Sequence, residues 1–184
     1  MKHFTTFLSV AALILSASGS LAQTASPYAG QEQRSIKSLS DQEIGDLLEG
    51  RGMGLAKAAE LNSYPGPLHV LQLGDQLGLS DAQRTATKAL YADMRDKAQP
   101  VGRKIIEAER NLNSTFADGR IDPASLRSQI AAIAILQGEL RAIHLETHLA
   151  QRSLLTPDQI ARYDVLRGYG GNQTPHGSQR HGGG

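Results

Sequence analysis

Two long stretches of the chain carry apolar residues at steps of three or four, the spacing of one face of an α-helix. They cover residues 80–116 and 122–153. Their apolar positions are Ala86, Leu90, Met94, Ala98, Val101, Ile105, Ala108, Leu112 and Phe116, then Leu126, Ile130, Ile133, Leu136, Leu140 and Ile143. A turn at residues 117–120 joins the two stretches, so we predict a long antiparallel helical hairpin.

Shorter helices are predicted to flank the hairpin. Ser40 and Glu43 have the spacing of a capping box, and the helix that they begin is expected to continue to Leu61. Two further short helices are expected at residues 67–78 and 157–167. Glycine is a poor helix former, so the glycines within the first short helix indicate either a break or a close approach of another backbone: Gly50, Gly52 and Gly54.

Pro100 lies inside the first long stretch. A proline removes one backbone hydrogen bond and clashes with the preceding turn, so we expect a kink near Gln99 rather than the end of the helix. A lone hairpin leaves apolar surface uncovered on both helices, and the short helices or a second subunit must cover it. The pattern therefore predicts an all-α domain over residues 40–168, which we expect to be dimeric.

Composition limits the kinds of protein that this chain can be. Hydrophobic residues make up 40% of the 184 residues but aromatic residues only 4%, which is typical of thin helical assemblies with aliphatic cores. The formal net charge of +1 gives no strong attraction to nucleic acid. The chain has no cysteine, which excludes disulfides and thiolate metal sites. No nucleophile, base and orienting group form a catalytic pattern, so we expect no enzyme.

Both ends of the chain differ in composition from the middle. Residues 1–22 have a polar start, an apolar run and the small-residue pattern Ser20-Leu21-Ala22, which predict a cleaved signal peptide. The mature chain would begin at Gln23 with a flexible lead over residues 23–39, and it would carry no transmembrane anchor. Residues 169–184 are rich in Gly, Gln and His and are predicted to form a disordered tail. These features predict export to the periplasm.

A short motif occurs twice, each time at the start of a predicted helix. In each copy a leucine precedes a hydroxyl residue, and a glutamine follows three positions later, which is the spacing of a capping box. We expect the hydroxyl of the second copy to contribute about 1 kcal/mol to stability and its glutamine to contribute less. The two copies are Leu79, Ser80 and Gln83, and Leu155, Thr156 and Gln159.

These paired motifs resemble the LTxxQ motifs of the Spy/CpxP family of bacterial periplasmic chaperones and stress proteins. The first copy departs from the pattern because Ser80 replaces threonine, which keeps the hydroxyl. The resemblance implies a thin all-helical protein that dimerises into a cradle and holds unfolded client proteins without ATP. Our first hypothesis is therefore a periplasmic holdase for unfolded or misfolded envelope proteins.

His144 and His148 are the residues most suited to binding chemistry. Their i, i+4 spacing places both imidazoles on one helix face, where they can bind one metal ion such as Zn, Cu, Ni or Co. His69 is the candidate third ligand. A related branch of the family comprises periplasmic heavy-metal sensors with histidines near the second motif, so the alternative hypothesis is a metal-binding resistance protein or sensor.

Two other interpretations of the histidines stay open. His144 and His148 continue the apolar stripe, so they are also consistent with histidines at the edge of the core, hydrogen-bonded to a facing helix. They could also form a pH-responsive pair, because an unperturbed histidine titrates near neutral pH. His176 and His181 lie in the predicted tail, where two histidines indicate loose metal capture or only a solvated linker.

Overall fold

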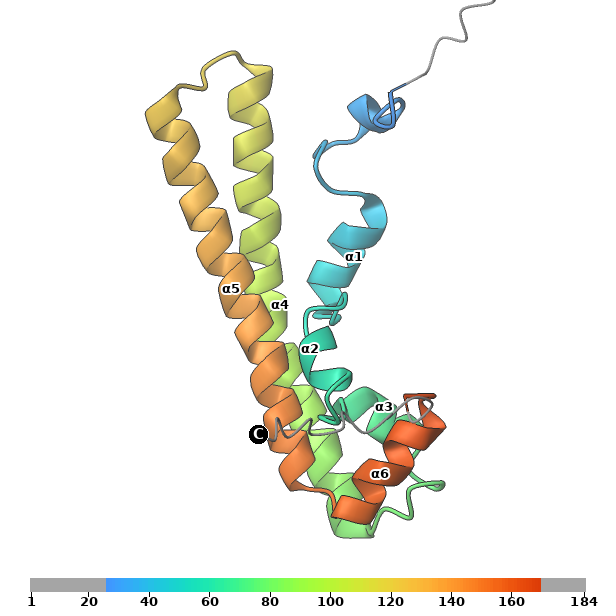
Figure 1. Cartoon of the computed structure of the whole chain (residues 1–184). Helices are drawn as coiled ribbons and strands as arrows, with labels where there is room; N and C mark the ends of the chain where they lie inside the picture. The colour runs from blue at the N-terminus through green and yellow to red at the C-terminus, as the bar shows by residue number, and fades with distance from the viewer. Residues whose placement is uncertain (1–25, 170–184) are drawn as a thin grey trace, which may run out of the picture.

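The structure is a computed structural model, and it describes residues 26–169. Within this range the chain is all-helical and has no strand. Figure 1 shows two long helices side by side as a hairpin, with the shorter helices along one side and at the base. The predicted all-α fold with a long helical hairpin is confirmed. In chain order the elements are η1 (Gln31–Gln33), α1 (Asp41–Glu49), α2 (Lys57–Glu60), α3 (Pro67–Gln72), α4 (Asp81–Ala117), α5 (Pro123–Ser153) and α6 (Pro157–Leu166).

The hairpin helices α4 and α5 begin at residues that satisfy their free backbone N–H groups. Ser80 caps α4, and Asp122 caps α5 by accepting hydrogen bonds from two backbone N–H groups of its first turn. Gly119 allows the turn between the helices, since its φ of +63° is a conformation that other residues rarely adopt. Helix α4 continues through Pro100 without a break, as expected, whereas the kink near Gln99 stays a prediction.

The prediction of a single helix from Ser40 to Leu61 is wrong. Helix α1 ends at Glu49, because Gly50 adopts a left-handed conformation with φ of +65° and returns its N–H to carbonyl groups of the last turn. Two further positive φ angles, at Met53 and Gly54, keep the chain out of a helix until α2 begins. Of the two alternatives for the glycines, a break in the helix is thus present.

The other alternative, close backbone approach, is also present where α1 crosses α4. A Cβ atom added to Gly102 would lie 2.1 Å from the carbonyl oxygen of Leu47, a distance that real atoms cannot adopt. A Cβ atom added to Gly50 would lie 3.1 Å from that of Ala98. Small residues on both helices therefore allow α1 to lie directly on the middle of α4.

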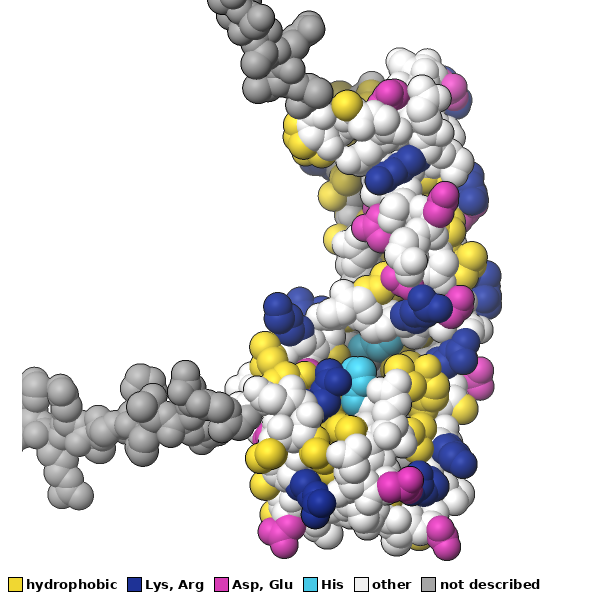
Figure 2. Space-filling model, turned by 90° about the vertical axis from the view of Figure 1, so that its right-hand side faces the viewer, with side chains coloured by type: hydrophobic (Ala, Val, Ile, Leu, Met, Phe, Trp, Pro, Cys, Tyr) yellow, Lys and Arg dark blue, Asp and Glu magenta, His cyan; other side chains and the backbone are white. Residues whose placement is uncertain are grey.

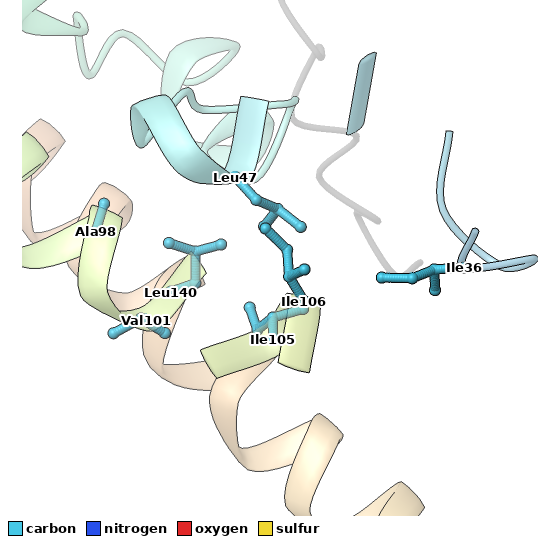
Figure 3. Packing of buried hydrophobic residues seen from close by; sticks show 7 residues of the cluster. All are labelled: Ile36, Leu47, Ala98, Val101, Ile105, Ile106 and Leu140. Atoms are coloured by element: carbon cyan, nitrogen blue, oxygen red, sulfur yellow. The ribbon is translucent and has the colours of Figure 1, made fainter. Parts of the chain in front are cut away.

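The main core lies at this crossing, between α1, α4 and α5. Figure 3 shows that α1, α4 and α5 all contribute aliphatic side chains to this cluster. Ile36 joins them from a segment that we predicted to be a flexible lead, and only 1% of its surface is exposed. The buried members are Ile36, Leu47, Ala98, Val101, Ile105, Ile106 and Leu140.

A second, smaller core lies at the base of the hairpin, where α3 and α6 meet the end of α5. Its buried members are Val70, Leu77, Leu155 and Tyr163. Towards the tip of the hairpin burial decreases, so Phe116 and Ile130 are 54% and 49% exposed although they belong to the predicted apolar stripes. The short helices thus cover the base and middle of the hairpin and leave its tip open.

Candidate functional site

The three candidate histidines line one cavity beside the middle of the hairpin. His144 and His148 are one turn apart on α5, and His69 comes from α3. The cavity has a volume of about 220 Å³ and is open to solvent on one side. Figure 2 shows histidine side chains gathered in a hollow on this face of the molecule. The fold therefore brings together residues that are up to 79 positions apart in the chain.

The ring of His148 is oriented by its surroundings. Its Nδ1 lies 2.7 Å from the carbonyl oxygen of Tyr64, which can only accept a hydrogen bond, so Nδ1 carries the hydrogen. This leaves Nε2 as the atom with a free lone pair. A carboxylate oxygen of Glu60 lies 3.8 Å from the same Nδ1. A backbone carbonyl or carboxylate behind the ring is the usual support for a histidine that binds metal through its other nitrogen.

The loop before α3 approaches the His148 ring so closely that only glycine fits there. A Cβ atom added to Gly66 would lie 2.9 Å from Cε1 and 3.0 Å from Nε2 of the ring. The turn at residues 64–67 therefore contacts His148 in two ways. The carbonyl of Tyr64 accepts its hydrogen bond, and Gly66, which has no side chain, leaves room for its ring. The sequence Tyr64-Pro65-Gly66-Pro67 is typical of a turn, but its contact with α5 depends on the tertiary fold.

His144 is buried and has an unsatisfied nitrogen. Its side chain is 3% exposed, and Nε2 has no hydrogen-bond partner. Burial lowers the pKa of His144, and the charge of protonated His148 lowers it further. The imidazole is therefore neutral at neutral pH and keeps a lone pair. A buried polar atom without a partner is uncommon in folded proteins, and a metal ion would satisfy it.

His69 completes the cavity wall but stands apart from the α5 pair. Its Nδ1 is hydrogen-bonded to the side-chain oxygen of Gln72 at 3.0 Å, which leaves its Nε2 free as in His148. Between residues 26 and 169, however, His, Cys, Asp and Glu side chains nowhere form a group of three or more that could hold a metal ion. The structure thus places His69 at the cavity without placing it in a three-histidine cluster.

Glu60 links this cavity to α6 and to Tyr169, and the sequence analysis did not identify Glu60 as a site residue. One of its oxygens accepts hydrogen bonds from the hydroxyls of Tyr163 and Tyr169, at 2.5 and 3.1 Å, and from Arg167 at 3.3 Å. The other accepts from the backbone N–H of Gly66 at 3.2 Å. Burial and the bond to Glu60 raise the pKa of Tyr163, which keeps its hydroxyl protonated. The Glu60 carboxylate therefore connects α2, on which it lies, with the turn at residues 64–67 and with α6.

The two repeated motifs lie side by side at the base of the hairpin. In each, the hydroxyl accepts from the glutamine backbone N–H, and the glutamine side chain accepts from the cap backbone N–H, so both capping boxes are present. The glutamine side chains also bond to each other: Gln83 Nε2 donates to Gln159 Oε1 at 2.8 Å, and Gln159 Nε2 donates to Gln83 Oε1 at 3.1 Å. Gln83 further donates to the carbonyl of Leu154 at 2.8 Å. The motifs therefore cap two helices and join them.

The fold and site define a class of thin, all-helical hairpin proteins with paired capping motifs and a histidine-lined cavity. Residues 55–162 match the heavy-metal resistance family, and the chain belongs to this family. The family is related to the all-helical periplasmic proteins of the Spy/CpxP type. The matched range includes both motifs and the three histidines of the cavity. No curated protein and no solved structure matches the chain.

Two sequence predictions concern residues outside the described range. The signal peptide, residues 1–22, and the tail histidines His176 and His181 both lie there. Within residues 26–169, none of the helices combines the length and the apolar character that crossing a membrane requires.

Proposed function

We propose that this protein is a periplasmic heavy-metal resistance protein that binds a metal ion through His144 and His148. The observation that carries this proposal is the buried Nε2 of His144, which has no hydrogen-bond partner. His148, whose ring is oriented by the Tyr64 carbonyl, lies one helical turn away. Membership of the heavy-metal resistance family supports it. The site residues fit a metal because two imidazoles one helical turn apart on one helix face are common protein donors for Zn, Cu, Ni and Co.

The surrounding residues would support this role without binding the metal themselves. Tyr64 and Glu60 lie on the Nδ1 side of His148, so the lone pair of its Nε2 stays free to bind a metal ion. The low pKa of His144 means that little proton competition opposes a metal at neutral pH. His69 lines the same cavity from α3 and is the candidate for a further donor. The function is therefore binding of an ion rather than catalysis.

Titration of the mature chain, residues 23–184, with Zn, Cu, Ni and Co tests the proposal by isothermal calorimetry. We expect micromolar or tighter binding of at least one ion, lost when His144→Ala and His148→Ala are combined. The matched control combines His176→Ala and His181→Ala, which removes two histidines that lie outside the described residues. Absence of binding in the wild type, or loss only in the control, would refute the proposal. Circular dichroism checks that each variant keeps its helices.

A second candidate function, the ATP-independent holdase, is favoured by apolar side chains exposed on the hairpin. Ile135 and Leu149 on α5 are 70% and 55% exposed, and Phe116 near the tip is 54% exposed. Exposed aliphatic groups beside mixed charges can bind unfolded envelope proteins without reading their sequence. The same surfaces support the cradle-like homodimer, because a second copy of the chain would cover part of them.

Light scattering of a chemically unfolded client tests the holdase. The wild type should suppress aggregation without ATP, and Ile135→Ser combined with Leu149→Ser should weaken this effect. Combining His144→Ala with His148→Ala should leave it unchanged apart from any loss of stability. A wild type without suppression removes the holdase from consideration. Sedimentation equilibrium tests the dimer, and the N-terminal mass of the exported protein tests cleavage before Gln23.

A further inference from the structure

The cavity wall contains a soft sulfur donor as well as the histidines. Met94, on α4, faces the cavity that His144 and His148 line from α5, and only 6% of its surface is exposed. A thioether is a neutral ligand that prefers soft metal ions, above all Cu(I). The lining of the cavity therefore includes two imidazoles, which are borderline donors, and one soft thioether.

The same wall carries no carboxylate. Arg51, a cation, is the charged residue that lines it. The carboxylate of Glu60 lies 3.8 Å from His148, but on the Nδ1 side of the ring. Both of its oxygens already accept hydrogen bonds. The residues that line the cavity therefore offer an ion no opposite charge.

Charge then decides between a divalent and a monovalent ion. The free energy needed to move an ion out of water grows with the square of its charge. The desolvation free energy of a divalent ion is therefore about four times that of a monovalent ion of similar size. Carboxylates or thiolates normally offset this in zinc sites. Cu(I) carries one charge and is stable with two or three soft donors. The lining, which has imidazoles and a thioether but no carboxylate, therefore suits Cu(I) better than zinc.

We propose that the histidine cavity is a site for monovalent copper, Cu(I), and that the thioether of Met94 sets this preference. This inference rests on the proposed function, since it names the ion taken by the same two histidines. His144 and His148 supply the imidazoles, and Met94 distinguishes soft from borderline ions. Because Met94 is buried and lines the cavity, its sulfur is accessible to an ion inside the cavity and not to copper at the protein surface.

Competition titration tests the inference with Cu(I) itself, kept reduced in an anaerobic chamber and held by a chromophoric chelator. The variant is Met94→Leu, which keeps the side-chain volume and removes the sulfur. The matched control is Met53→Leu, an exposed methionine that does not line this cavity. We expect Met94→Leu to weaken Cu(I) binding by roughly tenfold or more and to leave Zn and Ni binding unchanged, whereas Met53→Leu changes neither.

X-ray absorption at the copper edge provides a measurement that does not depend on a variant. The wild-type complex should show nitrogen neighbours and one sulfur neighbour. Copper with nitrogen and oxygen neighbours alone, or Zn or Ni binding as tight as Cu(I), overturns the inference but leaves the proposed metal function intact. A wild type that binds no ion at all overturns the proposed function instead.

Discussion

The reciprocal bonds between Gln83 and Gln159 predict that these two glutamines stabilise the fold more than a helix cap alone. Gln83 takes part in four hydrogen bonds: to the Ser80 N–H, to the Leu154 carbonyl, and two with the amide of Gln159. With roughly 0.5–1 kcal/mol of net stabilisation for each bond, Gln83→Ala should lower the free energy of unfolding by about 2–4 kcal/mol. Because Gln159 shares two of these bonds, its replacement by alanine should have an effect of similar size.

The shared bonds also predict that the two substitutions are not additive. The double variant should lose about 1 kcal/mol less than the sum of the single losses, since the bonds between the two amides can be removed only once. Urea denaturation followed by circular dichroism measures all three values. Gln83→Glu is the matched control, because glutamate keeps the capping acceptor but cannot donate to the Leu154 carbonyl.

We expect Gln83→Glu to destabilise the protein even though the capping box is preserved. If Gln83→Glu is neutral, or the two alanine substitutions are strictly additive, the bond between the motifs contributes nothing and only the caps matter. This prediction reverses the order expected from the sequence, in which Gln159 contributes less than the hydroxyl of Thr156.

Three further predictions concern single positions. Thr156→Ala should lower the free energy of unfolding by about 1 kcal/mol through loss of the cap of α6, and an unchanged urea midpoint would contradict this. Gly102→Ala should destabilise strongly because its Cβ would overlap the Leu47 carbonyl, whereas Gly138→Ala, which meets nothing within 4 Å in α5, should stabilise by up to about 1 kcal/mol. The folded pKa of His144 lies below its ordinary value of 6.5, so its contribution to stability is complete above pH 6.5 and is lost as the pH falls below that value. His144→Gln should therefore flatten the decline in thermal midpoint between neutral and acidic pH, and an identical decline in both proteins would refute this.

The hairpin could be predicted because its information is local. Apolar residues at helical spacing over both long stretches, and a cap at the start of each, define α4 and α5 without reference to the rest of the chain. Even Pro100 was compatible with the pattern. The early end of α1 was harder to predict, since the apolar spacing continues past Gly50 and only the left-handed backbone of this residue stops the helix.

The site could be predicted only in part, because its remaining members act through tertiary contacts. The spacing of His144 and His148 identifies the pair on α5. Nothing in the sequence shows that Glu60 lies behind His148 or that Met94 belongs to the same cavity, since these contacts depend on how α2 and α4 pack against α5. Likewise, the sequence predicts each glutamine of the motifs as part of a helix cap. It does not predict the hydrogen bond between them, which forms only because the starts of α4 and α6 meet in the fold.

The contacts of Glu60 also affect when the chain can fold during synthesis. The hydroxyl of Tyr169, which donates to Glu60, lies 109 residues later in the chain, and that of Tyr163 lies 103 residues later. A growing or truncated polypeptide that stops before α6 leaves this carboxylate without these donors, and it leaves Val70 and Leu77 without their partners in the small core. Such non-local contacts delay folding until nearly the whole chain has emerged. Incomplete products are therefore expected to stay open at the base and to be degraded readily by proteases, which would remove truncated copies before they could bind metal or clients.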